Sequence, residues 1–174
     1  MRAESREMNR PSQLTLREVL PSDLDPLYAH SLEPEAIRMA AFVGQGRTER
    51  AVFDAHWAKI LQDPRNTNRT IVADGHVAGH IACFPQDGHL EVTYWLGREF
   101  WGRGLATEAL RQLLQRVTVR PIFGRAAKDN LGSIRVLQKC GFKIVGEDKG
   151  FAHGRGEETE EYILSLDPPA ARPA

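Results

Sequence analysis

One glycine-containing segment, Trp101-Gly102-Arg103-Gly104-Leu105-Ala106-Thr107, limits the folds open to this chain more than any other feature. It lies between Leu90–Gly97, a run rich in β-branched and aromatic residues, and Gly104–Val117, whose apolar residues recur at helical spacing. A strand that turns through glycines into a helix presents backbone N–H groups where the helix dipole favours an anion. The segment therefore predicts a seat for a phosphate group.

The remaining patterns predict a mixed α/β domain. Helices are expected over residues 21–31, 34–40, 48–62 and 131–140, and further strands over 14–19, 70–73, 77–84, 121–127, 142–151 and 159–166. Asp74-Gly75 and Pro85–Gly88 are expected as turns, Asp129 or Asn130 as a helix cap and Gly141 as a helix stop. Helices that interrupt a run of mostly antiparallel strands indicate a single domain with a central mixed sheet flanked by helices.

The helix over 48–62 shows the helical period in its apolar residues. The expected buried stripe consists of Val52, Phe53, Trp57, Ile60 and Leu61. The domain is expected over residues 14–166, between flexible tails at 1–13 and 167–174.

Composition argues against several classes of function. The 23 Lys and Arg residues balance 23 Asp and Glu residues, so the net charge gives no attraction to nucleic acid or anionic lipid. No apolar run approaches the roughly 18 residues of a membrane span. Cys83 and Cys140 form no CxxC pair, and His76 and His80 have no evident third ligand. We expect a cytoplasmic protein with reduced thiols and no metal site.

Three kinds of phosphate site compete for the glycine segment. Residues 97–104 (GREFWGRG) lack the Lys and the Ser or Thr that complete a P-loop. A dinucleotide-binding fingerprint would need a third glycine at Thr107, although Asp129 lies at the distance expected for a ribose-binding acid. The third kind is a loop for the pyrophosphate of coenzyme A.

The third interpretation is supported by a family resemblance. WLGREFWGRGLATEAL followed by DNLGSIRVLQKCGF resembles the GNAT N-acetyltransferases, specifically the ribosomal-protein (RimJ/RimL-like) branch. The resemblance spans about Leu14 to Leu166, and its specific motifs lie between Glu91 and Phe142. It implies a GNAT fold whose sheet splays beside the pantetheine arm, acetyl-CoA as acetyl donor and an amine as acceptor.

The resemblance also implies roles for individual residues. Residues 102–107 match the loop whose amides hold the pyrophosphate, 96–98 match the strand end beside the pantetheine arm, and Asn130 matches a side chain that contacts that arm. The implied coenzyme-binding residues are Leu96, Gly97, Arg98, Gly102, Arg103, Gly104, Leu105, Ala106, Thr107 and Asn130.

Two residues are candidates for catalysis. Glu91 matches the family's glutamate before the loop and is the candidate base for the attacking amine; the alternative is a solvent-facing strand carboxylate. Ser133 matches a position that can hydrogen-bond the departing thiolate; the alternative is a helix-capping serine.

The acceptor is expected to be a primary amine, on a protein N-terminus or on a small molecule. Residues 147–161 hold six acids against two bases, either an acidic lip that attracts a cationic amine or a solvated edge hairpin. A homodimer is a further possibility that the family implies. The competing function is a non-catalytic acyl-CoA-binding module.

Overall fold

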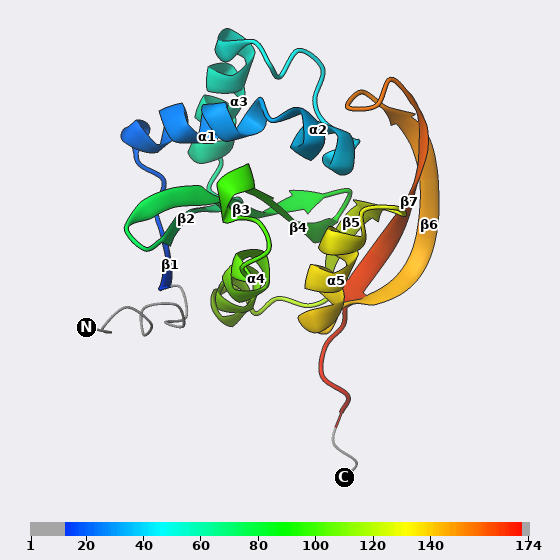
Figure 1. Cartoon of the computed structure of the whole chain (residues 1–174). Coiled ribbons are helices and arrows are strands. Elements are labelled where there is room, and N and C mark those ends of the chain that lie inside the picture. The colour runs from blue at the N-terminus through cyan, green and yellow to red at the C-terminus, as the bar shows by residue number, and fades with distance from the viewer. Residues whose placement is uncertain (1–12, 172–174) are drawn as a thin grey trace, which may run out of the picture.

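A seven-stranded sheet forms the centre of the computed structural model, which describes residues 13–171. The strand order is β1-β2-β3-β4-β5-β7-β6, and every neighbouring pair is antiparallel except β4 and β5 (Figure 1). This arrangement confirms the expected mixed, mostly antiparallel sheet. The strands are β1 (Leu14–Arg17), β2 (Thr67–Ala73), β3 (His76–Gln86), β4 (His89–Leu96), β5 (Ile122–Ala127), β6 (Lys143–Ala152) and β7 (Glu157–Leu166).

Five α-helices cover the two faces of this sheet. Figure 1 shows α1–α3 on one side and α4 and α5 on the other. Their bounds are α1 (Leu24–Ser31), α2 (Pro34–Ala40), α3 (Arg50–Gln62), α4 (Leu105–Arg116) and α5 (Leu131–Lys139). No helix within residues 13–171 combines the length and the apolar character of a membrane span. The tails predicted at 1–13 and 167–174 fall partly outside the described residues, and they stay a prediction.

Two tight hairpin turns set the register of β2, β3 and β4. Asp74 and Gly75 have φ angles of 50° and 81°, and Asp87 and Gly88 have 47° and 84°. Consecutive left-handed residues are what a two-residue hairpin turn requires. The turn expected over Pro85–Gly88 is therefore shorter than predicted, because Pro85 pairs with Leu90 inside the ladder.

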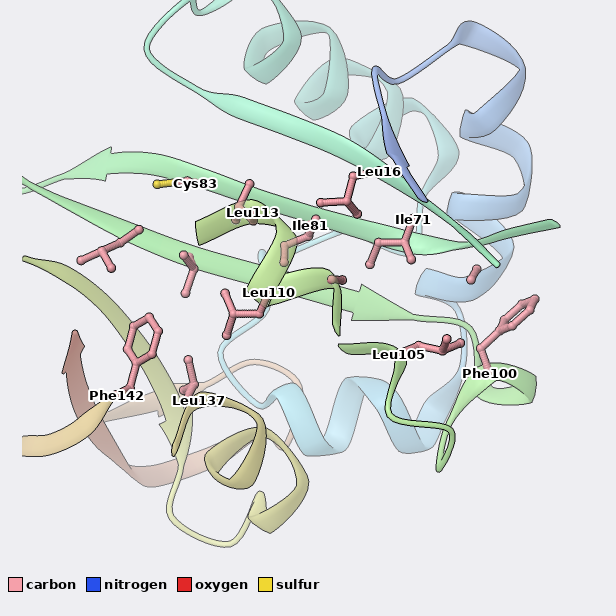
Figure 2. Close-up of a cluster of buried hydrophobic side chains, with 14 of the residues drawn as sticks. Leu16, Ile71, Ile81, Cys83, Phe100, Leu105, Leu110, Leu113, Leu137 and Phe142 are labelled. Atoms are coloured by element: carbon pink, nitrogen blue, oxygen red, sulfur yellow. The ribbon is translucent and has the colours of Figure 1, made fainter. Parts of the chain in front are cut away.

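The main hydrophobic core lies between the sheet and helices α4 and α5 (Figure 2). Leu110 and Leu113 of α4 are fully buried there, together with Ile81 of β3 and Leu137 of α5. At about 25 cal/mol per Å² of buried apolar surface, this cluster fixes α4 and α5 against the strands. The end of α4 that points at the glycine segment is thereby held in place.

A second, smaller core lies on the opposite face, where Phe53 and Trp57 of α3 pack with Leu27 of α1. The predicted stripe of α3 is wrong at two of its five positions. Val52 is 38% exposed and Leu61 is 44% exposed. Val52 is next to the buried Phe53, and Leu61 is next to the half-buried Ile60. Because successive residues of a helix are about 100° apart around its axis, Val52 and Leu61 point away from α1.

Candidate functional site

The two parallel strands of the sheet separate almost as soon as they meet. β4 and β5 pair only at Leu90–Ile122 and Glu91–Phe123. Beyond these positions a cavity of about 790 Å³ opens, bounded by both strands, α2, α5 and the N-terminal end of α4. The splayed sheet that the family resemblance implied is therefore present.

The opening leaves part of the β4 backbone without a neighbouring strand. Gly97 N–H donates to Ala78 O of β3 at 2.9 Å. Backbone groups alternate in direction along an antiparallel strand, so those of Leu96 and Tyr94 face the opening. Trp101 Nε1 donates to Leu96 O at 3.1 Å, which leaves the Leu96 N–H directed at the cavity. Sequence reasoning gave Trp101 no such role, because no local pattern indicates the partner of its indole.

The glycine segment forms one end of the cavity. Gly102 and Gly104 have φ angles of 72° and 73°, and no atom lies within 4 Å of where a Cβ would stand on either. Both residues line the cavity, as do Leu105, Ala106 and Thr107 in the first turn of α4. The first N–H groups of a helix have no partner within the helix, so this end of the cavity suits an anion.

Three of the predicted coenzyme residues lie outside the cavity wall. Gly97 is packed against His30, with a Cβ position only 2.6 Å from the imidazole. Arg98 Nη1 lies 2.6 Å from Glu33 Oε1, and Arg103 Nη2 lies 2.6 Å from Asp74 Oδ2. Both guanidinium groups are thus held by carboxylates on the surface beside the glycine segment. Their contact with a coenzyme stays a prediction.

Ser133, in the first turn of α5, lines the same cavity as the glycine segment. The Ser133 and Tyr94 hydroxyls lie 2.8 Å apart, and the Tyr94 hydroxyl also donates to Ser133 O at 3.2 Å. Burial raises the pKa of Tyr94, so its phenol stays protonated at neutral pH. Two hydroxyls therefore share one side of the cavity. No local sequence signal indicates this role for Tyr94, because its hydroxyl partner lies 39 residues away in the chain.

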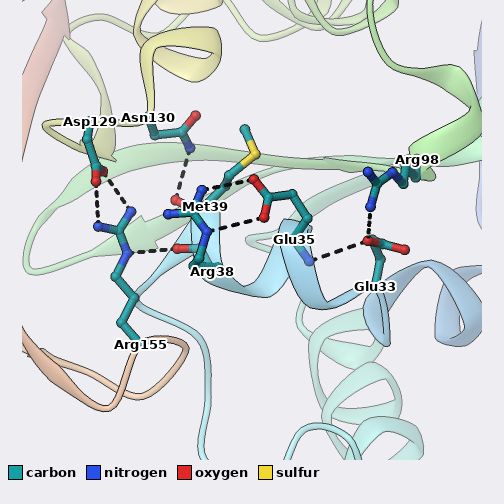
Figure 3. A network of polar contacts seen from close by, with 8 residues as sticks. All are labelled: Glu33, Glu35, Arg38, Met39, Arg98, Asp129, Asn130 and Arg155. Atoms are coloured by element: carbon teal, nitrogen blue, oxygen red, sulfur yellow. Dashed lines mark hydrogen bonds and ion pairs between the residues drawn. The ribbon is translucent and has the colours of Figure 1, made fainter.

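The helix cap expected at the start of α5 is provided by Asn130. Its Oδ1 accepts from Ser133 N–H at 3.2 Å, and its Nδ2 donates to Met39 O at 3.2 Å (Figure 3). The same side chain therefore caps α5 and ties it to α2, which forms the roof of the cavity. The cap uses only the backbone N–H of Ser133, so the Ser133 hydroxyl is available to contact Tyr94 and to face the cavity.

Glu91 lies where β4 and β5 separate, and it is buried rather than solvent-facing. Its Oε1 accepts from Arg125 Nε at 3.3 Å and lies 3.2 Å from His89 Nε2. Arg125 Nη1 also contacts Asp148 at 3.1 Å and Glu161 at 2.7 Å. One guanidinium thus faces three carboxylates, and the group keeps an excess of negative charge. Glu91, Arg125 and Glu161 all line the cavity.

The other acids of residues 147–161 are largely neutralised on the surface of the β6–β7 hairpin. Lys128 Nζ lies 2.8 Å from Glu147 and 3.7 Å from Glu160, and Lys149 Nζ lies 2.6 Å from Glu158. Exposed ion pairs of this kind are typical of a solvated edge hairpin. Negative charge reaches the cavity mainly through the group around Arg125.

The roof of the cavity is held by a polar network (Figure 3). Arg155 donates to both carboxylate oxygens of Asp129, at 2.7 and 2.8 Å, and to Arg38 O of α2 at 2.8 Å. The hydrogen bonds and charge of Arg155 lower the pKa of Asp129. Both oxygens of Asp129 are therefore occupied, and the mostly antiparallel sheet is not a doubly wound one. The dinucleotide interpretation is wrong on both counts.

Known proteins share this fold. Residues 13–143 match the family described as the acetyltransferase (GNAT) domain. The uncharacterized N-acetyltransferase p20 of Bacillus licheniformis is 28% identical over 85 residues, which cover 47% of this chain and only about half (48%) of that protein.

Two solved structures show the same fold. A spermidine N-acetyltransferase from Vibrio cholerae, in complex with CoA and spermine, superposes with a TM-score of 0.76 at 16% identity, over 89% of this chain and 95% of the other. RimJ of Mycobacterium smegmatis, in complex with CoA-disulfide, gives a TM-score of 0.73 at 20% identity, over 88% and 81%. With the family match over three quarters of its length, the chain belongs to the GNAT acetyltransferase family.

Proposed function

We propose that this protein is an acetyl-CoA-dependent N-acetyltransferase that moves an acetyl group to a primary amine. The observation that carries the proposal is the cavity between β4 and β5, which is lined both by the N-terminus of α4 and by the Ser133–Tyr94 hydroxyl pair. This combination offers both an anion seat and a proton donor within one continuous space.

The cavity fits an extended donor such as acetyl-CoA. The amides of Gly102–Thr107 would receive the pyrophosphate at the start of α4, where the helix dipole is favourable. The pantetheine arm would lie in the opening and accept a hydrogen bond from the Leu96 N–H. A β4 N–H that faces the opening would polarise the thioester carbonyl and stabilise the oxyanion of the transition state.

The chemistry follows from what the cavity walls present. The neutral amine attacks the acetyl carbonyl, so that a C–N bond forms and the C–S bond breaks. The Ser133 hydroxyl donates a proton toward the departing thiolate, Tyr94, at 2.8 Å, returns a proton to Ser133, and solvent reprotonates Tyr94. After the C–N bond forms, the nitrogen loses a proton to Glu91, directly or through water, and Glu91 passes it to solvent. The same base deprotonates the acceptor ammonium before the attack. The surplus negative charge around Arg125 stabilises the ammonium that precedes this loss.

Two of the structural relatives support coenzyme A as the group that this family fold binds. The Vibrio cholerae protein was crystallised with CoA and spermine, and Mycobacterium smegmatis RimJ with CoA-disulfide. Of the two complexes, that of the Vibrio cholerae protein also holds a polyamine, and that of RimJ holds the coenzyme. They therefore support the donor proposed here rather than a particular acceptor.

The proposal is tested by thiol release from acetyl-CoA in the presence of a panel of primary amines. An N-acetyltransferase releases thiol only when an amine is added, and an equal amount of acetylated amine accumulates. Glu91→Gln and Ser133→Ala are expected to lower kcat while the Kd for acetyl-CoA stays within about twofold. A protein that binds acetyl-CoA and releases no thiol with any amine would instead be an acyl-CoA-binding module.

A further inference from the structure

Among the residues that the structure describes, Arg47 is a cation in the cavity wall without an anionic partner. It lies in the segment between α2 and α3, and its Cζ stands 4.5 Å from the centre of the Trp95 ring. Its Nε is buried with no hydrogen-bond partner, and within residues 13–171 no carboxylate forms an ion pair with it. A half-buried guanidinium in this state loses hydration that the contact with the Trp95 ring offsets only in part. An anion in the cavity, which Arg47 lines, would offset the rest through the Nη groups, since the buried Nε is closed to it.

The surroundings of Arg47 do not neutralise its charge. The ionisable groups close enough to interact with it include His80 of β3 and His56 of α3. Burial, and then the charge of Arg47, lower the pKa of His80 to about 3, so this histidine stays neutral. The same two causes lower the pKa of His56. This end of the cavity is therefore positive.

The other end of the same strand face is negative. Glu91 and Trp95 lie on one face of β4, because they are four residues apart and side chains alternate. At about 3.3 Å per residue, their Cα atoms are roughly 13 Å apart. Glu91, Asp148 and Glu161 all contact Arg125. Three carboxylates therefore face one guanidinium, and two negative charges are left over. A molecule lying along this face would meet negative charge at one end and positive charge at the other.

We propose that Arg47 binds a carboxylate on the acceptor, so that the acceptors of this protein are primary amines that also carry a carboxylate. The inference rests on the proposed function and specifies the substrate class of the same site. The Trp95 ring covers one face of the Arg47 guanidinium. The edge of a planar guanidinium offers paired N–H donors whose spacing matches the two oxygens of a carboxylate. The ammonium of the acceptor then lies toward Glu91 and Glu161.

The wild-type protein provides the first test. The carboxylates 4-aminobutanoate and 6-aminohexanoate are compared with their neutral amides, and amidated Ala-Asp-Ala is compared with amidated Ala-Asn-Ala. A charge-assisted hydrogen bond predicts a kcat/KM advantage of at least about 10-fold for the acidic member of a pair. A preference seen only with the amino acids indicates a small-molecule acceptor, and one seen only with the peptides indicates an acidic peptide. Equal or better acetylation of the neutral members in both arms overturns the inference and leaves the N-acetyltransferase proposal intact.

Two substitutions at Arg47 assign the preference to this residue. Arg47→Met and Arg47→Gln are expected to bring the ratio of acidic to neutral kcat/KM close to one. Arg50→Met is the matched control, because Arg50 is paired with Asp25 and Asp54 and lies outside the cavity wall. It is expected to keep the wild-type ratio. A preference that survives in both Arg47 variants overturns the inference.

A stability measurement separates this inference from the proposed function. With coenzyme A present, 6-aminohexanoate is expected to raise the Tm of the wild type more than its amide does, and Arg47→Gln is expected to abolish the difference. This result without any acetyl transfer would contradict the proposed function and support the carboxylate site. Equal Tm shifts with the acid and the amide in the wild type would contradict the site.

Discussion

The two halves of the cavity are built in different ways. The half formed by the glycine segment, α4 and the start of α5, here called the donor half, presents mainly backbone groups positioned by two left-handed glycines and by helix ends. The half formed by α2, Arg47, Trp95 and the Arg125 group, here called the acceptor half, presents side chains from segments far apart in the sequence.

This difference separates what the fold supplies from what individual side chains supply. An anion seat made of amides needs only a strand, a glycine turn and a helix in the right order. Charge selectivity at the acceptor half depends on which ion pairs form across the sheet and which cation is left unpaired. Substitutions in the donor half should therefore alter coenzyme affinity or the chemical step, and those in the acceptor half should alter acceptor preference.

The largest effect is expected in the donor half, where Ser133 at the start of α5 meets Tyr94 of β4. Ser133→Ala should lower kcat about 100-fold, a typical loss for a positioned proton donor, with little change in the Kd for acetyl-CoA. Tyr94→Phe should have a smaller effect, and the double variant should be less impaired than the product of the two, because the hydroxyls act together. Steady-state kinetics of the four proteins measure this. Independent, multiplicative effects would show that the pair is not a relay.

The donor half is tested by a charge placed at the helix end. Gly104→Glu should weaken acetyl-CoA binding on the order of 30-fold, because the carboxylate opposes the pyrophosphate at the start of α4. Gly88→Glu is the matched control, since Gly88 has φ +84° against +73° for Gly104 and equally open space. Calorimetric titration gives both Kd values. Equal weakening in the two variants would attribute the effect to backbone strain and not to the anion seat.

The anchoring of α1, the helix that precedes the acceptor half in the chain, is tested at Asp23, its N-cap residue. Burial raises the pKa of Asp23, but hydrogen bonds from Arg17, the Leu20 N–H and Thr70 outweigh this and hold the pKa at about 2 instead of 3.8. Because the folded-state pKa is depressed, this carboxylate stabilises the protein above about pH 4, and the contribution is lost as pH falls toward 2.

Asp23→Asn should therefore lower the free energy of unfolding by about 2 kcal/mol at pH 7, with a shrinking difference from wild type below pH 4. Urea denaturation across pH 2 to 7 gives the comparison. A difference that stays constant over this range would mean that the carboxylate's charge is not what stabilises α1.

The smallest effect is expected from the roof of the cavity. Arg155→Met removes the links from the β6–β7 hairpin to Asp129 and to the α2 backbone. We expect the KM for the acceptor to rise about threefold to tenfold, since a partly exposed ion pair contributes about 1 kcal/mol, while the Kd for acetyl-CoA stays unchanged. Initial-rate kinetics with each substrate varied decide this. A rise in the KM for acetyl-CoA alone would show that α2 and its link to Arg155 shape the donor half and not the acceptor half.

Sequence patterns predicted the donor half far better than the acceptor half. The glycine segment, the Asn130 cap and the Gly141 helix stop are local signals, and the structure has a left-handed residue or a capping bond at each. Arg125 carries no local signal, because its role depends on carboxylates of distant strands. Arg47 carries none either, because its role depends on the lack of a carboxylate partner within residues 13–171. Val52 and Leu61 were misplaced for the same reason, since periodicity does not indicate how wide a face α1 covers.

The most direct test of the central claim is a thermal-shift comparison of acetyl-CoA, NADPH and MgATP at one concentration. A ligand at about 100 times its Kd stabilises the folded state by about 2.7 kcal/mol, enough to raise Tm by a few degrees. We predict a shift with acetyl-CoA alone, reduced in Gly104→Glu and kept in Gly88→Glu. A shift with NADPH and none with acetyl-CoA would contradict the assignment of the cavity to the acetyl donor.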